Sequence, residues 1–308
     1  MALPHERTAM RRAGRSPLAV RDGAPILCIR LLGEFDLRRG EDSLPPVESA
    51  RAESLLAYLL LHQDAPQSRQ HLAFLLWPDS TEPQARTNLR HVLHTLRRAL
   101  PDADQFLEVT PRTLRWRMDE PFWLDVAAFA DAASSAEREA ADGGLAALRE
   151  AVELYTGDLL AGRYDEWLLG ERQRLRQRFL DALERLAALL EAGGDHAQAL
   201  RYAERLLRHD SLREETYRLL MRLHDARGDR ARALHVYHVC AATLERELGV
   251  EPSARTQETY EELLSLAGEP ADVGRQAGRI GGPPAGWEGA RSGAPDGPQA
   301  RGRGRPGP

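Results

Sequence analysis

The chain has 308 residues, enough for about two domains at roughly 150 residues each. Hydrophobic residues make up 42% and charged residues 29%, values typical of a globular protein, and the formal net charge is −5. Lysine is absent from the sequence, which excludes chemistry that requires it, such as Schiff-base formation or a phosphate-loop lysine. The two cysteines, Cys28 and Cys240, lie far apart and exclude a disulfide framework and a cysteine-rich zinc site.

Both ends of the sequence predict disorder. Residues 1–25 are rich in arginine and lack the apolar core of a secretory signal. Residues 267–308 are rich in glycine and proline and show no hydrophobic periodicity, so they cannot bury enough apolar surface to fold. The longest unbroken apolar run, Leu55–Leu61, is much shorter than the roughly 20 residues that span a bilayer. The sequence therefore predicts a cytoplasmic protein with no membrane segment.

Residues 26–118 predict short strands, then three helices, then a hairpin. The alternating stretch ILCIRLLGEFDLRR is typical of strands. The period then becomes helical, with Ser49 as the N-cap of the first helix and Ser68 opening the second. Pro83 stands in the first turn of the third helix, where its missing N–H costs nothing, and Pro101 stops that helix. The stretch FLEVTPRTLRWRM alternates apolar and polar residues on both sides of a turn, as a two-stranded hairpin does.

The third helix carries charge of one sign. Its apolar stripe, which must face a core, consists of Leu89, Val92, Leu93, Leu96 and Leu100. From Arg86 to Leu100 there are four arginines and no acidic residue, whereas a solvated helix usually mixes its charges. This favours an anionic partner, and Arg and Asn side chains suit base edges and phosphates. The alternative is a plain amphipathic helix whose arginines pair with acidic residues elsewhere in the fold.

The hairpin adds positive charge next to this helix. It contains three more arginines and two threonines that could bond phosphates at the turn: Arg112, Arg115, Arg117, Thr110 and Thr113. Trp116 is expected to pack the hairpin onto the helices. A helix suited to the major groove, followed by a basic hairpin that reaches the neighbouring backbone, is typical of a winged helix-turn-helix.

Residues 119–266 predict a second domain that is helical throughout and partly repetitive. The segment GDHAQAL at Gly194 recurs as GDRARAL at Gly228, an offset of 34 residues, which is the tetratricopeptide period. Each Gly-Asp pair is expected to end one helix and cap the next. A long helix is expected from about Tyr164 to Glu191. The predicted fold class is therefore mainly α: a winged helix with a small sheet and a C-terminal hairpin, followed by an all-α tetratricopeptide-like domain.

The two predicted domains differ in charge. Residues 26–118 contain twelve arginines and twelve acidic residues, whereas residues 119–270 contain nineteen arginines and thirty acidic residues. The second domain should therefore repel DNA and keep a duplex on the winged-helix side.

The sequence contains no pattern of catalytic chemistry. His91 and His94 are three residues apart, as are His235 and His238, but two imidazoles make an incomplete metal site. The GxSxG, HExxH and glycine-rich phosphate-binding motifs are missing from the sequence. We expect no metal, no cofactor and no enzymatic activity.

The motif LLWPDS…ARTNLRHVLHTLRRAL resembles the DNA-binding domain of the SARP family, the Streptomyces antibiotic regulatory proteins. The following FWLDVAAFADAAS and the repeated helices resemble the bacterial transcriptional activator domain of that family. The likeness covers roughly residues 26–266. It implies an OmpR-like winged helix that binds repeated promoter sites in double-stranded DNA, with a homodimer on those sites, and that helps to recruit RNA polymerase.

The resemblance also assigns roles to residues. The helix from Gln84 to Leu100 becomes the recognition helix and Thr110 to Arg115 the wing. The implied DNA contacts are Arg86, Thr87, Asn88, Arg90, His91, His94, Arg97, Arg98, Thr110, Arg112, Thr113 and Arg115. The loop before the recognition helix becomes a candidate polymerase contact through Asp79, Ser80, Thr81 and Glu82, although it can also be a plain turn bounded by prolines.

Two functions follow from these observations. The first is a sequence-specific DNA-binding regulator, an activator rather than a repressor, whose acidic helical domain binds partners or the transcription machinery. The second is a non-enzymatic adaptor that uses the tetratricopeptide-like domain and whose winged helix does not bind DNA. A one-signed helix beside a one-signed hairpin favours the first, because an adaptor has no need of it.

Overall fold

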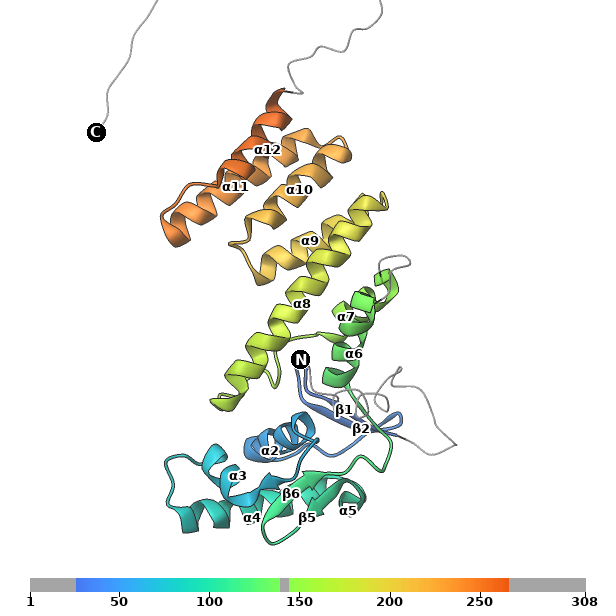
Figure 1. The fold of residues 1–308 in the computed structure, drawn as a ribbon, viewed down its shortest axis with the longest axis vertical. Coiled ribbons are helices and arrows are strands. Elements are labelled where there is room, and N and C mark those ends of the chain that lie inside the picture. Colours follow the sequence, from blue (N-terminus) through green and yellow to red (C-terminus); the bar gives the residue numbers. More distant parts are fainter. Residues whose placement is uncertain (1–25, 139–143, 266–308) are drawn as a thin grey trace, which may run out of the picture. The chain divides into compact units, whose positions relative to one another are not determined.

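The computed structural model describes residues 26–138 and 144–265 (Figure 1). The predictions of disorder for residues 1–25 and 267–308 lie outside the described residues. None of the helices in the described part contains a stretch that is long and apolar enough to cross a membrane.

The first sheet has the strand order β3-β2-β1-β7. Strands β1 (Leu27–Arg30), β2 (Asp36–Arg39) and β3 (Asp42–Ser43) are antiparallel neighbours. The alternating stretch that predicts strands contains β1 and β2, and β3 lies beyond it. Strand β7 (Phe122–Leu124) pairs in parallel with β1, with Leu27 opposite Phe122. The prediction that residues 119–266 are helical throughout is therefore wrong at β7, because these three buried residues find their hydrogen-bond partners in a strand almost a hundred residues earlier.

The three predicted helices are present as α2 (Ala50–Leu61), α3 (Arg69–Leu76) and α4 (Glu82–Ala99). The hydroxyl of Ser49 accepts from the amide of Ala52, and that of Ser68 accepts from the amide of His71, so both predicted N-caps are confirmed.

The predicted hairpin consists of β5 (Leu107–Val109) and β6 (Thr113–Trp116), preceded by the short helix α5 (Ala103–Phe106). A further strand, β4 (Gln67–Ser68), pairs with β6 and links the start of α3 to the hairpin. Trp116 is fully buried and stacks on Phe106 with ring centroids 5.4 Å apart, which confirms its predicted place in the core.

The remaining elements are helices, apart from their connections. They are α6 (Asp125–Arg138), α7 (Leu145–Leu154), α8 (Trp167–Ala192), α9 (His196–His209), α10 (Glu214–Ala226), α11 (Arg230–Leu248) and α12 (Ala254–Ser265). In each repeat the glycine has a φ of +78°, and the carboxylate of Asp195 or Asp229 caps the next helix. Both predicted Gly-Asp helix junctions are confirmed.

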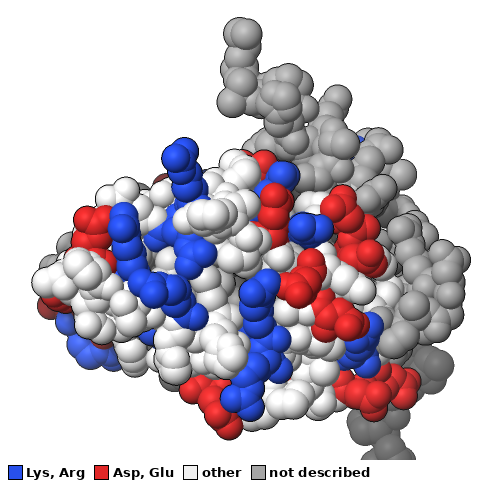
Figure 2. Space-filling model, turned by 90° about the horizontal axis from the view of Figure 1, so that it is seen from below, with Lys and Arg blue, Asp and Glu red and all other residues white. Residues whose placement is uncertain are grey.

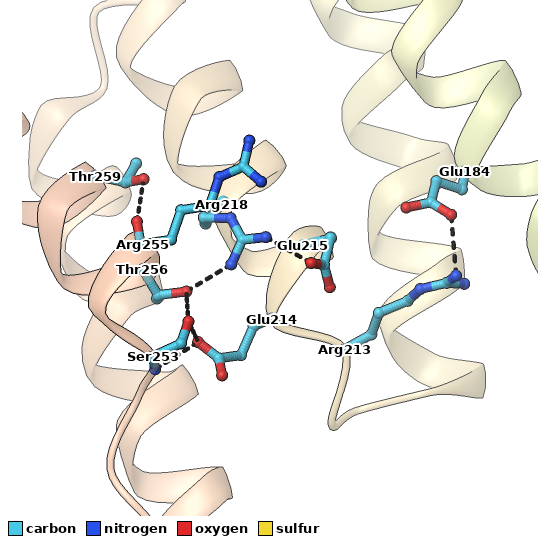
Figure 3. Close-up of polar contacts among 9 residues, drawn as sticks. All are labelled: Glu184, Arg213, Glu214, Glu215, Arg218, Ser253, Arg255, Thr256 and Thr259. Atoms are coloured by element: carbon cyan, nitrogen blue, oxygen red, sulfur yellow. Dashed lines mark hydrogen bonds and ion pairs between the residues drawn. The ribbon is translucent and has the colours of Figure 1, made fainter.

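A buried arginine joins the last helix to α10 (Figure 3). Arg218 donates from Nη1 to the hydroxyl of Thr256 over 2.9 Å and from Nη2 to Glu215 over 2.7 Å. Beside it, the carboxylate of Glu214 accepts from the backbone amide and the hydroxyl of Ser253. The buried guanidinium group of Arg218 thus has hydrogen-bond partners within the fold. Helix α12 is held against α10 by polar contacts as well as by apolar packing.

One hydrophobic core runs from the first sheet into the repeated helices. Across the predicted boundary, the carboxylate of Asp125 accepts hydrogen bonds from the amides of Leu31 and Leu32. The guanidinium of Arg163 contacts the buried carboxylate of Glu53, with Nε at 2.7 Å. The division into domains at residues 118 and 119 stays a prediction, and these contacts show that the core crosses it.

Candidate nucleic-acid interface

Helix α4 has a buried face and an exposed polar face. The buried face is formed by Ala85, Leu89, Val92, Leu93 and Leu96. Of the predicted contact residues on this helix, Asn88 is half-buried, and the others are exposed: Arg86, Thr87, Arg90, His91, His94, Arg97 and Arg98. The apolar stripe therefore fixes the rotation of the helix and turns these side chains outward.

The arginines of α4 differ in their partners. Arg86 forms an ion pair of 2.5 Å with Glu82, one turn earlier, and Arg97 pairs with Asp104 on α5. Within the described residues, no carboxylate oxygen lies within 4.0 Å of a guanidinium nitrogen of Arg90 or Arg98. The alternative of arginines that pair within the fold thus holds for two of the four side chains and leaves two positive charges uncompensated.

The wing turn uses its threonines internally. The hydroxyl of Thr110 accepts from the backbone amides of Arg112 and Thr113 and lies 2.8 Å from the hydroxyl of Thr113. These contacts hold the turn and present the exposed side chain of Arg112 at its tip, while Arg115 is half-buried on β6. The two threonines shape the wing, and a role for them in phosphate binding stays a prediction.

A groove of about 560 Å³ lies between the start of α3, the side of α4 and the wing tip. Its lining includes Arg69, Arg86, Arg90 and Arg112. Figure 2 shows arginine side chains gathered over part of the face that is seen from below in Figure 1, where these elements lie, with acidic side chains set mostly to one side.

Arg69 is the functional candidate that sequence reasoning missed. Its backbone amide donates to the carbonyl of Arg112 over 2.9 Å, and its Nη1 donates to the carbonyl of Thr110 over 3.1 Å. Burial and the nearby charge of Arg90 lower the pKa of Arg69. The sequence indicates that Arg69 opens a helix, because it directly follows the N-cap Ser68. Its position beside the wing follows only from the pairing of β4 with β6.

A second groove, of about 590 Å³, follows the other flank of α4. Its lining combines the loop before α2 with the later turns of α4: Pro45, Pro46, Glu48, Ser49, His91, His94, Thr95, Arg98 and Ala99. The helix thus stands between two hollows, of which the first is the more strongly basic.

The candidate polymerase loop joins α3 to α4, but Glu82, a predicted loop residue, is the first residue of α4. Thr81 is the N-cap of α4 but makes no side-chain capping bond, and Asp79 is exposed. Glu82 is committed to Arg86 and also accepts a long hydrogen bond of 3.4 Å from Gln70. The side chain of Glu82 is therefore engaged within the fold. The backbone amide of Ser80 donates a hydrogen bond to the carbonyl of Trp77.

The described residues, 26–138 and 144–265, contain no group of three or more His, Cys, Asp or Glu side chains that could hold a metal ion. The pair His91 and His94 lies on the exposed face of α4. In the pair His235 and His238, the second ring lies 3.4 Å from the hydroxyl of Tyr260.

Residues 124–264, from the end of β7 through α12, match the family model described as the bacterial transcriptional activator domain. The matched residues make up a little under half of this chain. The bacterial transcriptional activator domain accounts for the repeated helices, and the resemblance to the SARP family that the sequence indicates is confirmed.

Relatives extend the likeness toward the winged helix. The regulatory protein AfsR of Streptomyces coelicolor is 31% identical over 220 residues, which cover 70% of this chain and 22% of that protein. The chain spans about a quarter of the length of the AfsR proteins that it matches. The transcriptional regulatory protein MoaR1 of Mycobacterium tuberculosis is 26% identical over 243 residues, which cover 76% of this chain and 78% of that protein.

A solved structure shares the fold. It is that of Mycobacterium tuberculosis EmbR in complex with a low affinity phosphopeptide, with a TM-score of 0.64 and 20% identity, and the match covers 80% of this chain and 67% of that one. At this level of identity the likeness shows a shared fold.

Proposed function

We propose that the chain is a sequence-specific DNA-binding activator of transcription that inserts α4 into the major groove and lays the wing along the adjacent backbone. The observation that carries this proposal is that Arg90 and Arg98, both exposed on α4, have no carboxylate partner in the described residues, and that Arg90 lines one groove together with Arg112 at the wing tip. Two unpaired positive charges on the exposed side of one helix, with a third on the wing beside Arg90, fit a polyanion.

The side chains divide between positioning and reading. Arg98, Arg112 and Arg115 contact phosphates and fix the register, and Arg97 joins them when Asp104 releases it. Base edges are read by Arg86, Asn88, Arg90 and His91, because Arg and Asn form bidentate bonds to purine edges in the major groove. Thr87 and His94 add contacts to base or phosphate from the same exposed face.

Activation requires a second contact. We infer that the loop Asp79–Glu82 touches RNA polymerase and that the acidic helical domain binds partners or a second copy on repeated sites. The excess of acidic residues over 119–270 disfavours DNA on that domain. The named relatives are regulatory proteins, which supports a function without enzymatic activity or cofactor.

The test is a titration of the purified chain against the DNA upstream of its own gene and against scrambled duplex, at several salt concentrations. If about four to six phosphates are neutralised, a plot of the logarithm of the binding constant against the logarithm of the salt concentration should have a slope of roughly −4 to −5. Tighter binding to the upstream DNA with that slope supports the proposal. No binding at low salt contradicts it and favours the adaptor, and equal binding to both duplexes contradicts an operator at its own promoter.

A further inference from the structure

The basic groove beside α4 brings together four guanidinium groups from three elements. Arg69 comes from the start of α3, Arg86 and Arg90 from α4, and Arg112 from the wing. No acidic residue is among those that line it, and within the described part of the chain Arg86 is the member with a carboxylate partner. The neutral donors Ser68 and Gln70 complete its polar wall.

Such a cluster is costly without an anion. Like charges that face one hollow repel one another, and the pKa of Arg69 is lowered first by burial and then by the nearby charge of Arg90. The fold nevertheless holds Arg69 in place through its backbone amide and its Nη1, both bonded to carbonyls of the wing. An anion in the groove would convert the repulsion into attraction.

The chemistry of the lining selects the anion. Guanidinium groups are planar forks that bind phosphate oxygens through paired hydrogen bonds. A groove of about 560 Å³ is larger than one free phosphate ion needs, which fits a phosphate that is part of a chain. Its arginines on α4 belong to the face that we place in the major groove, so the adjacent backbone strand is the nearest source of phosphate.

We propose that the wing side of this groove, at Arg69 and Arg112, seats a backbone phosphate of the DNA, and that Arg69 is the residue that couples the wing to it. The inference rests on the proposed function and adds a contact and a positioning role that the sequence did not indicate. One part of the Arg69 guanidinium holds the wing through the carbonyl of Thr110. The positive charge of the same group faces the phosphate, so that binding of the backbone fixes wing and helix together.

Two substitutions separate the charge from the structural hydrogen bond. Arg69→Gln keeps a side-chain N–H donor and removes the charge, whereas Arg69→Lys keeps the charge. Arg255→Gln is the matched control, because Arg255 is exposed on α12, far along the chain from the groove. Thermal midpoints of all variants, measured without DNA, establish that each is folded.

The full chain is titrated with specific and scrambled duplex over a range of salt concentrations. Arg69→Gln should weaken binding to both duplexes by a similar factor, about tenfold, and reduce the salt slope by about 0.9, the value for one phosphate. Arg69→Lys and Arg255→Gln should keep the slope of the natural chain. The double variant, Arg69→Gln with Arg112→Gln, should lose DNA affinity by a smaller factor than the product of the two single-variant factors, because both side chains serve one site. An unchanged slope in Arg69→Gln would leave Arg69 a structural residue and overturn the proposal.

A second measurement separates this proposal from DNA binding itself. Pyrophosphate is added at constant ionic strength, and the thermal midpoint is followed for the natural chain and for Arg69→Gln. A rise in the natural chain alone supports a phosphate site in the groove. If the natural chain binds no DNA, the proposed function fails, and the pyrophosphate measurement then tests the groove separately. A rise of the thermal midpoint in the natural chain but not in Arg69→Gln identifies a free phosphate compound as the ligand. Equal thermal midpoints in the two chains overturn the phosphate site.

Discussion

The arginines on one helix show how local partners decide what a side chain can do. Arg86 and Arg90 are one turn apart, and both point into the basic groove, but Arg86 is paired with Glu82 and Arg90 has no carboxylate partner in the described residues. Binding DNA through Arg86 requires its ion pair to be shared or broken, while Arg90 is available. Arg90 is therefore the stronger candidate for reading a base.

Replacing Arg90 by Ala should reduce specific binding more than non-specific binding. A bidentate contact to a base is worth about 1–3 kcal/mol of discrimination, whereas a phosphate contact affects all sequences alike. The measurement is the ratio of dissociation constants for operator and scrambled duplex in the natural chain and the variant. An equal loss on both duplexes would assign Arg90 to the backbone.

A second residue, Asp125, fixes the junction between sheet and helices. Its buried carboxylate accepts hydrogen bonds from the amides of Leu31, Leu32 and Val126. Burial raises the pKa of Asp125 to about 6, although the backbone donors lower it. Since an unfolded aspartate has a pKa of about 3.9, the folded state binds the proton more tightly.

The free energy of unfolding should therefore carry a contribution from Asp125 that falls as the pH rises from about 4 to 6. Asp125→Asn should destabilise the chain by about 1–3 kcal/mol at pH 7.5, because its amide nitrogen faces backbone donors. The variant does not titrate at this position, so the gap in stability between the two chains should widen at pH 5. Urea unfolding at both pH values measures it, and a gap that narrows at pH 5 would contradict the raised pKa.

At the scale of elements, β7 decides where the winged helix ends. It lies beyond the hairpin in sequence, yet it completes the first sheet beside β1, and Phe122 packs edge-on against Trp116 with ring centroids 5.4 Å apart. A strand that supplies an edge of one sheet and a ring to the hairpin core belongs physically to the winged helix.

A fragment of residues 26–126 should consequently be more stable than one of residues 26–118. The longer fragment keeps β7 and Asp125, and the shorter one exposes the unpaired edge of β1 and the buried face of Trp116. Urea midpoints of the two fragments measure the difference, which we expect to be at least 1 M. Equal midpoints would show that residues up to 118 fold without β7.

At the scale of the whole molecule, the winged helix and the repeated helices are not joined by a loose linker. Besides the shared core, Trp167 donates to the hydroxyl of Ser54 over 3.1 Å, and its ring meets that of Tyr58 edge-on at 5.1 Å. Arg51 and Asp165 form a further ion pair across the same junction. A displacement of the helical domain would therefore act directly on α2, and α2 packs on α4.

The polymerase loop can be tested without disturbing DNA binding if its acidic residues are treated separately. Asp79→Ala should lower promoter-dependent transcription in vitro and leave DNA affinity unchanged, because Asp79 is exposed and outside both grooves. Glu82→Ala frees Arg86 and should strengthen non-specific binding, with a salt slope steeper by up to about 0.9. Full transcription by Asp79→Ala, measured on DNA saturated with the variant, would remove this residue from the contact.

The sequence by itself determined the elements whose cause is local. Serine and aspartate caps, proline stops, the apolar stripe of α4 and the 34-residue repeat each act within a few turns, and the structure places helices and hairpin where these signals lie. The ion pair of Glu82 and Arg86 has an equally local cause, because an acid four residues before an arginine lies next to it on a helix.

Only the tertiary structure decided the features that join distant segments. The parallel pairing of β7 with β1, the pairing of β4 with β6 and the position of Arg69 at the wing each depend on residues that are many positions apart. A strand of two or three residues has too little pattern to be distinguished from a turn or a helix end, and its partner is chosen by packing. The basic groove arises in the same way, because three elements must fold together before four arginines face one hollow.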